Sequence, residues 1–82
     1  MERLTILILV TAQALVDHED EVVVTLSQKA GRSTFILKVY PSDIGQVIGV
    51  GGKFINPLRD IIKASATKHR LGKVYLEIDT KS

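Results

Sequence analysis

The fold of this chain follows from one stretch, Val47-Ile48-Gly49-Val50-Gly51-Gly52-Lys53-Phe54-Ile55. A Gly-x-x-Gly loop at residues 49–52 separates two apolar segments. Because Gly49 and Gly52 lack Cβ atoms, a sugar-phosphate backbone can approach the main chain closely. The loop presents amides at the N-terminus of the next helix, where anions are favoured, and Lys53 adds a cation. The stretch predicts a helix–loop–helix unit that contacts phosphates, with an apolar floor for bases made by Val47, Ile48 and Ile55.

Other glycine-rich motifs do not fit this spacing. A dinucleotide-binding fingerprint that begins at Gly49 requires a small residue at position 54 and a strand before the loop. A P-loop that ends at Gly52-Lys53 requires Gly at position 47 and Ser or Thr at position 54. The chain has Val47 and Phe54 there, so both motifs are excluded. A plain glycine turn between two packed helices is the simplest alternative, but the string hydrophobic-Ile-Gly-x-x-Gly-x-x-Ile is more specific than such a turn.

A short helix is predicted before the loop. Its start signal is Pro41-Ser42-Asp43, in which Ser42 can cap the helix and Asp43 favours its positive end. The helix covers Ile44–Ile48 and stops at the glycines, which a helix interior tolerates poorly.

A longer helix is predicted after the loop, ending near His69 with Gly72 just beyond. Pro57 predicts either a late start of this helix, with Asn56 as the cap, or a bend. Its apolar face, at helical spacing, consists of Phe54, Ile55, Leu58, Ile61, Ile62 and Ala66.

Three strands are predicted from alternating apolar residues. The first two, Glu21–Gln28 and Thr34–Tyr40, flank a five-residue turn at Lys29–Ser33 and so indicate an antiparallel hairpin. The last strand is Lys73–Thr80.

The first segment, Leu4–Val16, has no charged residue and fits two structures. Ile6, Ile8 and Val10 favour a strand, whereas a continuous apolar run fits a buried helix equally well. The segment is too short for a membrane-spanning helix, which needs about 20 residues, and we interpret it as part of the mature fold rather than as a signal peptide. As a helix it is apolar all round, so we expect a second chain to cover part of it in a dimer.

The composition indicates one small ordered domain. The chain has 82 residues, of which 45% are hydrophobic and 24% are charged, unlike a disordered chain. The absence of Cys excludes disulfides, thiolate metal ligands and a Cys nucleophile. Residues 1–48 carry a net charge of −2 and residues 49–82 a net charge of +4. This asymmetry is weak evidence for a basic surface that binds polyanions.

No catalytic or metal site is predicted. His18 lies in the acidic stretch Asp17-His18-Glu19-Asp20, but four adjacent residues cannot all converge on one ion, so we expect a solvated loop. Arg59, Asp60 and Lys63 are interpreted as a solvated helix face. The sequence therefore predicts no enzyme, no metal and no cofactor.

These features together resemble the KH domain family, in its type II arrangement and in particular the small bacterial one-domain KH proteins of the KhpA type. The resemblance rests on the glycine loop with the stretches 14–18, 42–49 and 58–64. It implies an α+β fold in the order α-β-β-α-α-β, with a three-stranded sheet, helices packed on one face and a single KH domain over residues 1–82. The chain departs from the family at Val50, where a basic or polar residue is usual, and at Pro57.

The resemblance also implies a function. In KH domains the glycine loop clamps about four single-stranded nucleotides, and an adjacent groove reads their bases. The implied RNA-binding residues are Ile48, Gly49, Val50, Gly51, Gly52, Lys53, Ile55 and Lys38. The resemblance also implies that the second hairpin strand, near Lys38, borders the groove.

The family further implies a cytoplasmic, non-catalytic RNA chaperone or post-transcriptional regulator that affects cell elongation and envelope homeostasis. Its implied partners are single-stranded RNA and either a second copy or a larger KH protein of the KhpB type, with no insertion into a membrane. The alternative from another class is a protein-interaction or assembly module, with Val50 marking weak or lost RNA affinity.

Overall fold

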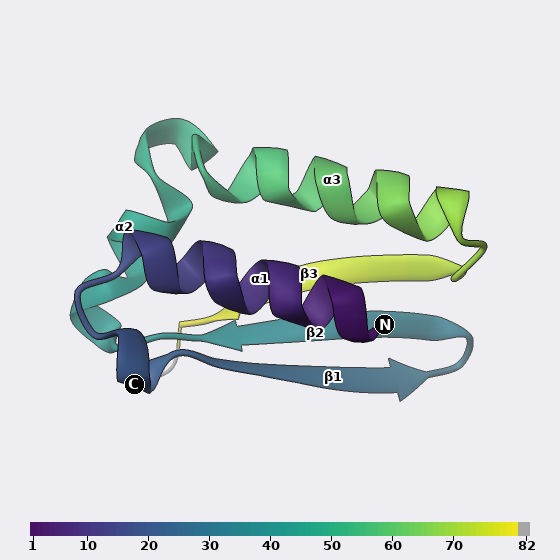
Figure 1. Cartoon of the computed structure of the whole chain (residues 1–82), viewed down its shortest axis with the longest axis horizontal. Helices are drawn as coiled ribbons and strands as arrows, with labels where there is room; N and C mark the ends of the chain where they lie inside the picture. The colour runs from purple at the N-terminus through teal and green to yellow at the C-terminus, as the bar shows by residue number, and fades with distance from the viewer. Residues whose placement is uncertain (81–82) are drawn as a thin grey trace.

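Two long helices and one short helix lie over one face of a three-stranded sheet in a computed structural model that describes residues 1–80 (Figure 1). Single turns of 3₁₀ helix at Glu19–Glu21, Pro41–Asp43 and Val50–Gly52 connect the main elements. The α+β class and the predicted order of helices and strands are confirmed. In chain order the main elements are α1 (Glu2–Leu15), β1 (Val23–Lys29), β2 (Arg32–Lys38), α2 (Ile44–Ile48), α3 (Ile55–Lys68) and β3 (Lys73–Asp79).

The sheet has the strand order β1-β2-β3, so β2 is central and β3 is an edge strand. Strands β1 and β2 form the predicted antiparallel hairpin, whereas β3 pairs with β2 in parallel. A parallel pair needs a crossover connection. The segment from α2 through the glycine loop to α3 supplies it, and this places α3 beside β3.

The core lies between the sheet and the two long helices. Phe35 and Leu37 on β2 are fully buried, and so is Ile8 on α1. Each long helix contributes a stripe at helical spacing that faces the sheet. The buried residues of these stripes are Leu4, Ile8 and Ala12 on α1 and Ile55, Leu58, Ile62 and Ala66 on α3.

The ambiguous first segment is helical. A strand would have placed Ile6, Ile8 and Val10 on one face, whereas the helix buries Ile8 completely and leaves Ile6 and Val10 51% and 56% exposed. The helix is favoured because Leu4, Ile8 and Ala12 then lie in one line over the sheet.

The hairpin turn is shorter than predicted. The strands extend to Lys29 and Arg32, which are directly paired, so only Ala30 and Gly31 form the turn. Both have positive φ, at 50° and 76°. A two-residue turn of this kind matches the right-handed twist of the flanking strands, which is why it replaces the predicted five-residue loop.

Pro57 is accommodated by a late start of α3, one of the two predicted solutions. The helix begins at Ile55 with Phe54 at its N-cap, so Asn56 is not the cap. Pro57 is therefore the third helical residue, where a backbone N–H has no intrahelical partner, and the missing donor removes no bond. The first bond within the helix is donated by the Leu58 amide to the Phe54 carbonyl at 3.4 Å.

Candidate nucleic-acid interface

The glycine loop is held in place by main-chain hydrogen bonds at both ends. The Gly49 amide donates to the Gly45 carbonyl at 2.9 Å, and the Phe54 amide donates to the Ile48 carbonyl at 3.1 Å. Inside the loop the Gly52 amide donates to the Gly49 carbonyl at 3.2 Å. These bonds fold residues 49–52 into a tight projecting turn between α2 and α3 (Figure 1).

Two glycines of this loop are required by close contacts as well as by backbone angles. Gly49 and Gly52 have φ values of 74° and 80°, which residues other than glycine rarely adopt. A Cβ atom on Gly49 would lie 2.8 Å from the Phe54 ring, and one on Gly52 would collide with the Asn56 amide group. The loop therefore keeps its shape only with glycine at these two positions.

The tip of the loop offers unpaired donors but little charge. Within the described residues 1–80, the backbone amides of Val50 and Gly51 have no hydrogen-bond partner. The Val50 side chain is 95% exposed, and Lys53 supplies the nearby cation. Unpaired amides beside a cation suit a phosphate oxygen.

A groove between α3 and β3, here called the α3–β3 groove, begins beside this loop. It consists of two adjoining hollows of about 260 and 330 Å³ that share Lys63, Val74 and Tyr75. Arg59 lies at the end nearer the loop, where its Nε donates to the Leu76 carbonyl at 3.2 Å. Its Nη1 donates to Asn56 Oδ1 at 3.5 Å. Asn56 packs against the loop at Gly52, so the loop and the groove form one continuous surface.

The sequence of this chain matches a known protein family. A family model for the KH domain of KhpA and KhpB proteins matches residues 6–78. The chain belongs to the KhpA/KhpB KH-domain family. The resemblance inferred from the glycine loop is thereby confirmed.

Relatives in the KhpA/KhpB family cover most of both chains. The RNA-binding protein KhpA of Halalkalibacterium halodurans is 45% identical over 68 residues, which are 82% of this chain and 87% of the relative. The RNA-binding protein KhpA of Clostridium acetobutylicum is 44% identical over 69 residues, 82% of this chain and 88% of the relative. The RNA-binding protein KhpA of Oceanobacillus iheyensis is 32% identical over 65 residues, 79% of this chain and 85% of the relative. No solved structure matches the chain.

Within this KH domain, the residues predicted to bind RNA fall into three groups. Residues 49–52 form the loop itself, and Lys53 and the half-buried Ile48 flank it. Ile55 lies in the core with only 3% of its surface exposed. It therefore packs beneath the loop on the core side and has little exposed surface for contact with a base. Lys38 is on the central strand β2, on the sheet face away from the helices. The strand that borders the groove is β3, because the parallel crossover places it beside α3.

The residues that line the α3–β3 groove were not among those predicted to bind RNA. Arg59 and Lys63 were interpreted as a solvated face, but Arg59 is half-buried and bonded to β3, and Lys63 lines both hollows. Tyr75 and Lys73 come from the edge strand. The four-residue spacing of Arg59 and Lys63 was a visible signal that they share a helix face, but only the strand order shows which face meets β3.

A buried carboxylate anchors the start of α2, which leads into the loop. The Asp43 side chain is 2% exposed, and its Oδ2 accepts from the His18 amide at 3.0 Å and lies 2.8 Å from His18 Nδ1. The His18 ring also stacks on Tyr40, with centroids 4.0 Å apart. Burial acts to raise the pKa of Asp43, but the hydrogen bonds and charge of His18 outweigh it and lower the pKa.

The stretch Asp17-His18-Glu19-Asp20 is exposed, as predicted for a solvated loop. The His18 side chain has a further role that was not predicted, because it joins the α1–β1 connection to the start of α2. The predicted Ser42 cap is wrong. Asp43 is the N-cap residue of α2, and no side chain donates or accepts a capping bond there, since the Asp43 carboxylate is engaged by His18.

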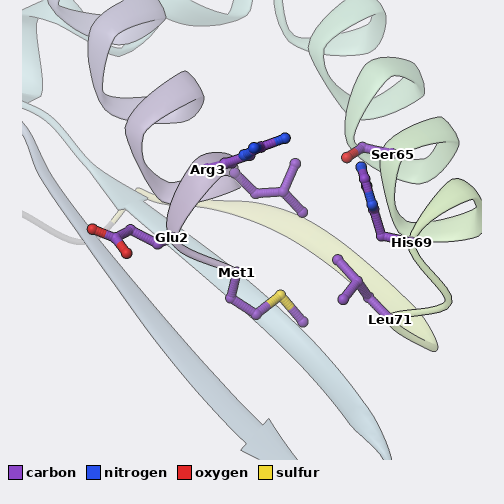
Figure 2. A pocket seen from close by; sticks show the side chains of 7 residues that line it. Met1, Glu2, Arg3, Ser65, His69 and Leu71 are labelled. Carbon is purple, nitrogen blue, oxygen red and sulfur yellow. The ribbon is translucent and has the colours of Figure 1, made fainter.

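A separate hollow of about 400 Å³ lies between the start of α1 and the end of α3 (Figure 2). The residues around it are Met1, Glu2, Arg3, Leu4, Ser65, His69 and Leu71. Figure 2 shows Arg3 reaching from α1 toward Ser65 on α3 and His69 just after it. This hollow is at the opposite end of α3 from the glycine loop, so it is not part of the KH surface described above. No helix within residues 1–80 is long and apolar enough to cross a membrane.

Proposed function

We propose that this protein binds single-stranded RNA, with phosphates at the Gly49–Gly52 loop and bases in the α3–β3 groove. The observation that carries the proposal is the pair of unpaired amides at Val50 and Gly51, held at the entrance of a groove by a loop that only glycine permits. The curated KhpA relatives are named as RNA-binding proteins, which supports the same function.

Each predicted residue has a separate role in this proposal. The loop amides and Lys53 contact phosphates, and Ile48 packs against the first base beside the loop. Ile55 fixes the loop from the core side. Lys38 contributes an outlying positive charge on the sheet. Because phosphate contacts release counterions, RNA affinity falls as the salt concentration rises.

The test is the double substitution Val50→Asp/Gly51→Asp. Val50 is 95% exposed, and a Cβ atom on Gly51 would meet no atom within 4 Å. Gly51 has a φ of 63°, which Asp tolerates better than most residues, so the fold is retained. Two carboxylates at a phosphate site repel RNA, and we expect affinity for a labelled single-stranded RNA to fall more than about 100-fold in fluorescence polarisation.

The matched control is Val50→Asn/Gly51→Asn, which has the same shape without the charge. It should bind within a few-fold of the wild type. Unchanged affinity of the Asp double variant, with an unchanged circular dichroism spectrum, would contradict the proposed loop contact.

A second candidate function is a protein-interaction or assembly module with weak RNA affinity. The observation in its favour is the almost fully exposed Val50 at a position where a cation would strengthen phosphate binding. Wild-type protein that binds no single-stranded RNA, of any base composition, at low salt would favour this function over the first.

We also propose that the domain occupies the whole chain, residues 1–82, of which 81 and 82 lie outside the described residues, and that it pairs with a second KH chain. Ile6 and Val10 on the outer face of α1 and Ile61 on α3 are each more than half exposed. Such apolar surface is covered when a second copy or a larger KH protein of the KhpB type binds. A cytoplasmic RNA chaperone that influences cell elongation and the envelope would act through such a pair.

Light scattering at micromolar concentration tests the pairing. The wild type should be dimeric, and Ile6→Asp/Val10→Asp should be monomeric. A wild type that is strictly monomeric would contradict self-pairing through α1.

A further inference from the structure

Three cations lie side by side across the sheet at the end near the hairpin turn. Lys29 on β1 is directly paired with Arg32 on β2, and Arg32 is directly paired with Lys73 on β3. Their neighbours Gln28, Ser33 and Val74 face the helices, so the three cations project from the opposite face, which no helix covers. With strands about 4.8 Å apart, this cationic row is about 10 Å long.

The cationic row lowers the stability of the fold, so folding by itself does not explain it. Like charges directly opposite each other on neighbouring strands destabilise a sheet. Over residues 1–80, none of the three side chains is in an ion pair, and all three are exposed. The next row of the same face, Ser27, Thr34 and Tyr75, contains no acidic residue to offset them. A surface that concentrates uncompensated positive charge fits a polyanion.

The cationic row is continuous with the α3–β3 groove. Lys73 and Tyr75 line the groove from the edge strand, and Tyr75 also lies under Arg32, whose guanidinium carbon is 4.5 Å from the centre of the ring. The ring therefore connects the groove at the edge of β3 with the cations on the open face. Lys73 begins β3 shortly after α3 ends at Lys68, so the row lies near the end of α3 farthest from the glycine loop. Figure 1 shows that end of α3 beside the start of β3. Since α3 has 14 residues, the loop and the row are about 21 Å apart along the helix.

We propose that an RNA strand leaving the α3–β3 groove turns around the edge of β3 and places its next phosphates on the cationic row. The inference rests on the proposed RNA binding at the glycine loop and extends it to a second phosphate site. A strand of about four nucleotides is held by the loop and the start of the groove. A longer strand also reaches Lys73, Arg32 and Lys29, and these contacts supply the charge that Val50 does not provide at the loop.

The experiment compares two lengths of single-stranded RNA, about four and about 12 nucleotides, of the same base composition. The variant is Lys29→Gln/Arg32→Gln, which removes two cations of the row and leaves the groove residue Lys73 in place. The matched control is Arg3→Gln/Lys68→Gln, which removes two exposed cations from α1 and α3 on the helix side of the molecule. Affinities and their salt dependence are measured by fluorescence polarisation.

The wild type should bind the longer RNA at least about tenfold more tightly than the shorter one. In the row variant the longer RNA should bind about tenfold more weakly, while the shorter RNA binds within about twofold of the wild type. The slope of log affinity against log salt for the longer RNA should become shallower by about 1.4, since each of the two lost contacts to single-stranded RNA removes about 0.7. The control should bind both lengths within about twofold of the wild type.

Three results would count against the inference, and each is distinct. If the wild type binds neither RNA, the proposed function itself fails. If it binds both but the row variant and the control are equal on the longer RNA, only the cationic row is excluded. If vesicles of phosphatidylglycerol and phosphatidylcholine bind the wild type but not the row variant, and the longer RNA shows no gain, the row serves an anionic lipid surface instead.

Discussion

The glycine loop and the cationic row differ in what they can provide to an RNA strand: the loop has a fixed backbone geometry, and the row has positive charge. The loop is contiguous in sequence, nearly uncharged at its tip, and strict in its backbone geometry. The row is assembled from three strands by their register, is strongly charged, and places no demand on backbone angles. In the proposed complex, the loop supplies the geometric fit to RNA and the row supplies most of the positive charge. Substitutions in the loop should therefore change binding of every RNA, and substitutions in the row should change only long RNAs.

Among the single substitutions, the largest expected effect comes from Gly52→Ala. The added Cβ atom displaces the exposed Asn56 side chain, and a φ of 80° is unfavourable for Ala, so the loop backbone is strained. Asn56 also accepts from Arg59, and the displacement therefore reaches the groove. We expect affinity for short and long single-stranded RNA to fall about 50-fold or more in fluorescence polarisation.

Gly45→Ala is the control for this substitution. Gly45 lies in α2, and a Cβ atom there would meet no atom within 4 Å. Because Ala is favoured over Gly in a helix, stability should be equal or higher and RNA affinity unchanged. Equal RNA binding by Gly52→Ala and Gly45→Ala would show that the loop geometry is not what binds RNA.

A smaller effect is expected when charge is added to the loop by Val50→Lys. The side chain at this position is almost fully exposed, so Lys fits without rearrangement. One additional phosphate contact should strengthen binding of short RNA about three- to tenfold and make the salt slope steeper by about 0.7. Val50→Gln, which adds length without charge, should bind as the wild type does. A Val50→Lys variant with unchanged affinity and slope would place the phosphates away from the loop tip.

The junction between Asp43 and His18 should influence stability as a function of pH. The folded-state pKa of Asp43 lies below its ordinary value, so its ionised carboxylate stabilises the fold at pH values above the unfolded pKa of about 3.9. This stabilisation is lost as the pH falls through the lower, folded-state pKa. Asp43→Asn should therefore melt several degrees below the wild type at pH 6.

The difference in melting temperature between the wild type and Asp43→Asn should shrink below pH 4. Asp17→Asn, on an exposed carboxylate in the same connection, is the control and should leave the melting temperature unchanged. If the gap for Asp43→Asn is the same at pH 3 and pH 6, then ionisation of Asp43 does not stabilise the start of α2.

The smallest effect is expected from relief of charge repulsion in the cationic row. Lys29→Gln removes one of two like-charged cross-strand pairs, each unfavourable by about 0.2–1 kcal/mol. The melting temperature should rise by about 1–3 °C at low salt, and the gain should disappear in about 1 M salt because the charges are then screened. A lower melting temperature at low salt would show that Lys29 stabilises the sheet instead.

The sequence predicted the loop and most of the fold because local patterns determine them. The glycines at 49 and 52, the helix of Ile44–Ile48 and the alternation of the three strands are all visible over short windows. The first helix was ambiguous because a continuous apolar run has no period that separates helix from strand. Only the sheet beneath it selects Leu4, Ile8 and Ala12 as one buried line.

The groove, the junction at Asp43 and the cationic row could not be predicted, because each joins residues that are distant in the chain. Arg59 meets Leu76 only when β3 pairs in parallel with β2. His18 meets Asp43 across 25 residues, with no local pattern that links them. The cationic row depends on the register of the hairpin strands. With the predicted five-residue turn, Lys29 would not lie opposite Arg32.

The most direct test of RNA binding at the glycine loop is the affinity of Val50→Asp/Gly51→Asp and of the wild type for single-stranded RNAs of about four and about 12 nucleotides. The double variant should keep the wild-type circular dichroism spectrum and lose more than about 100-fold in affinity for both lengths. A folded double variant that binds both RNAs as tightly as the wild type would contradict the account.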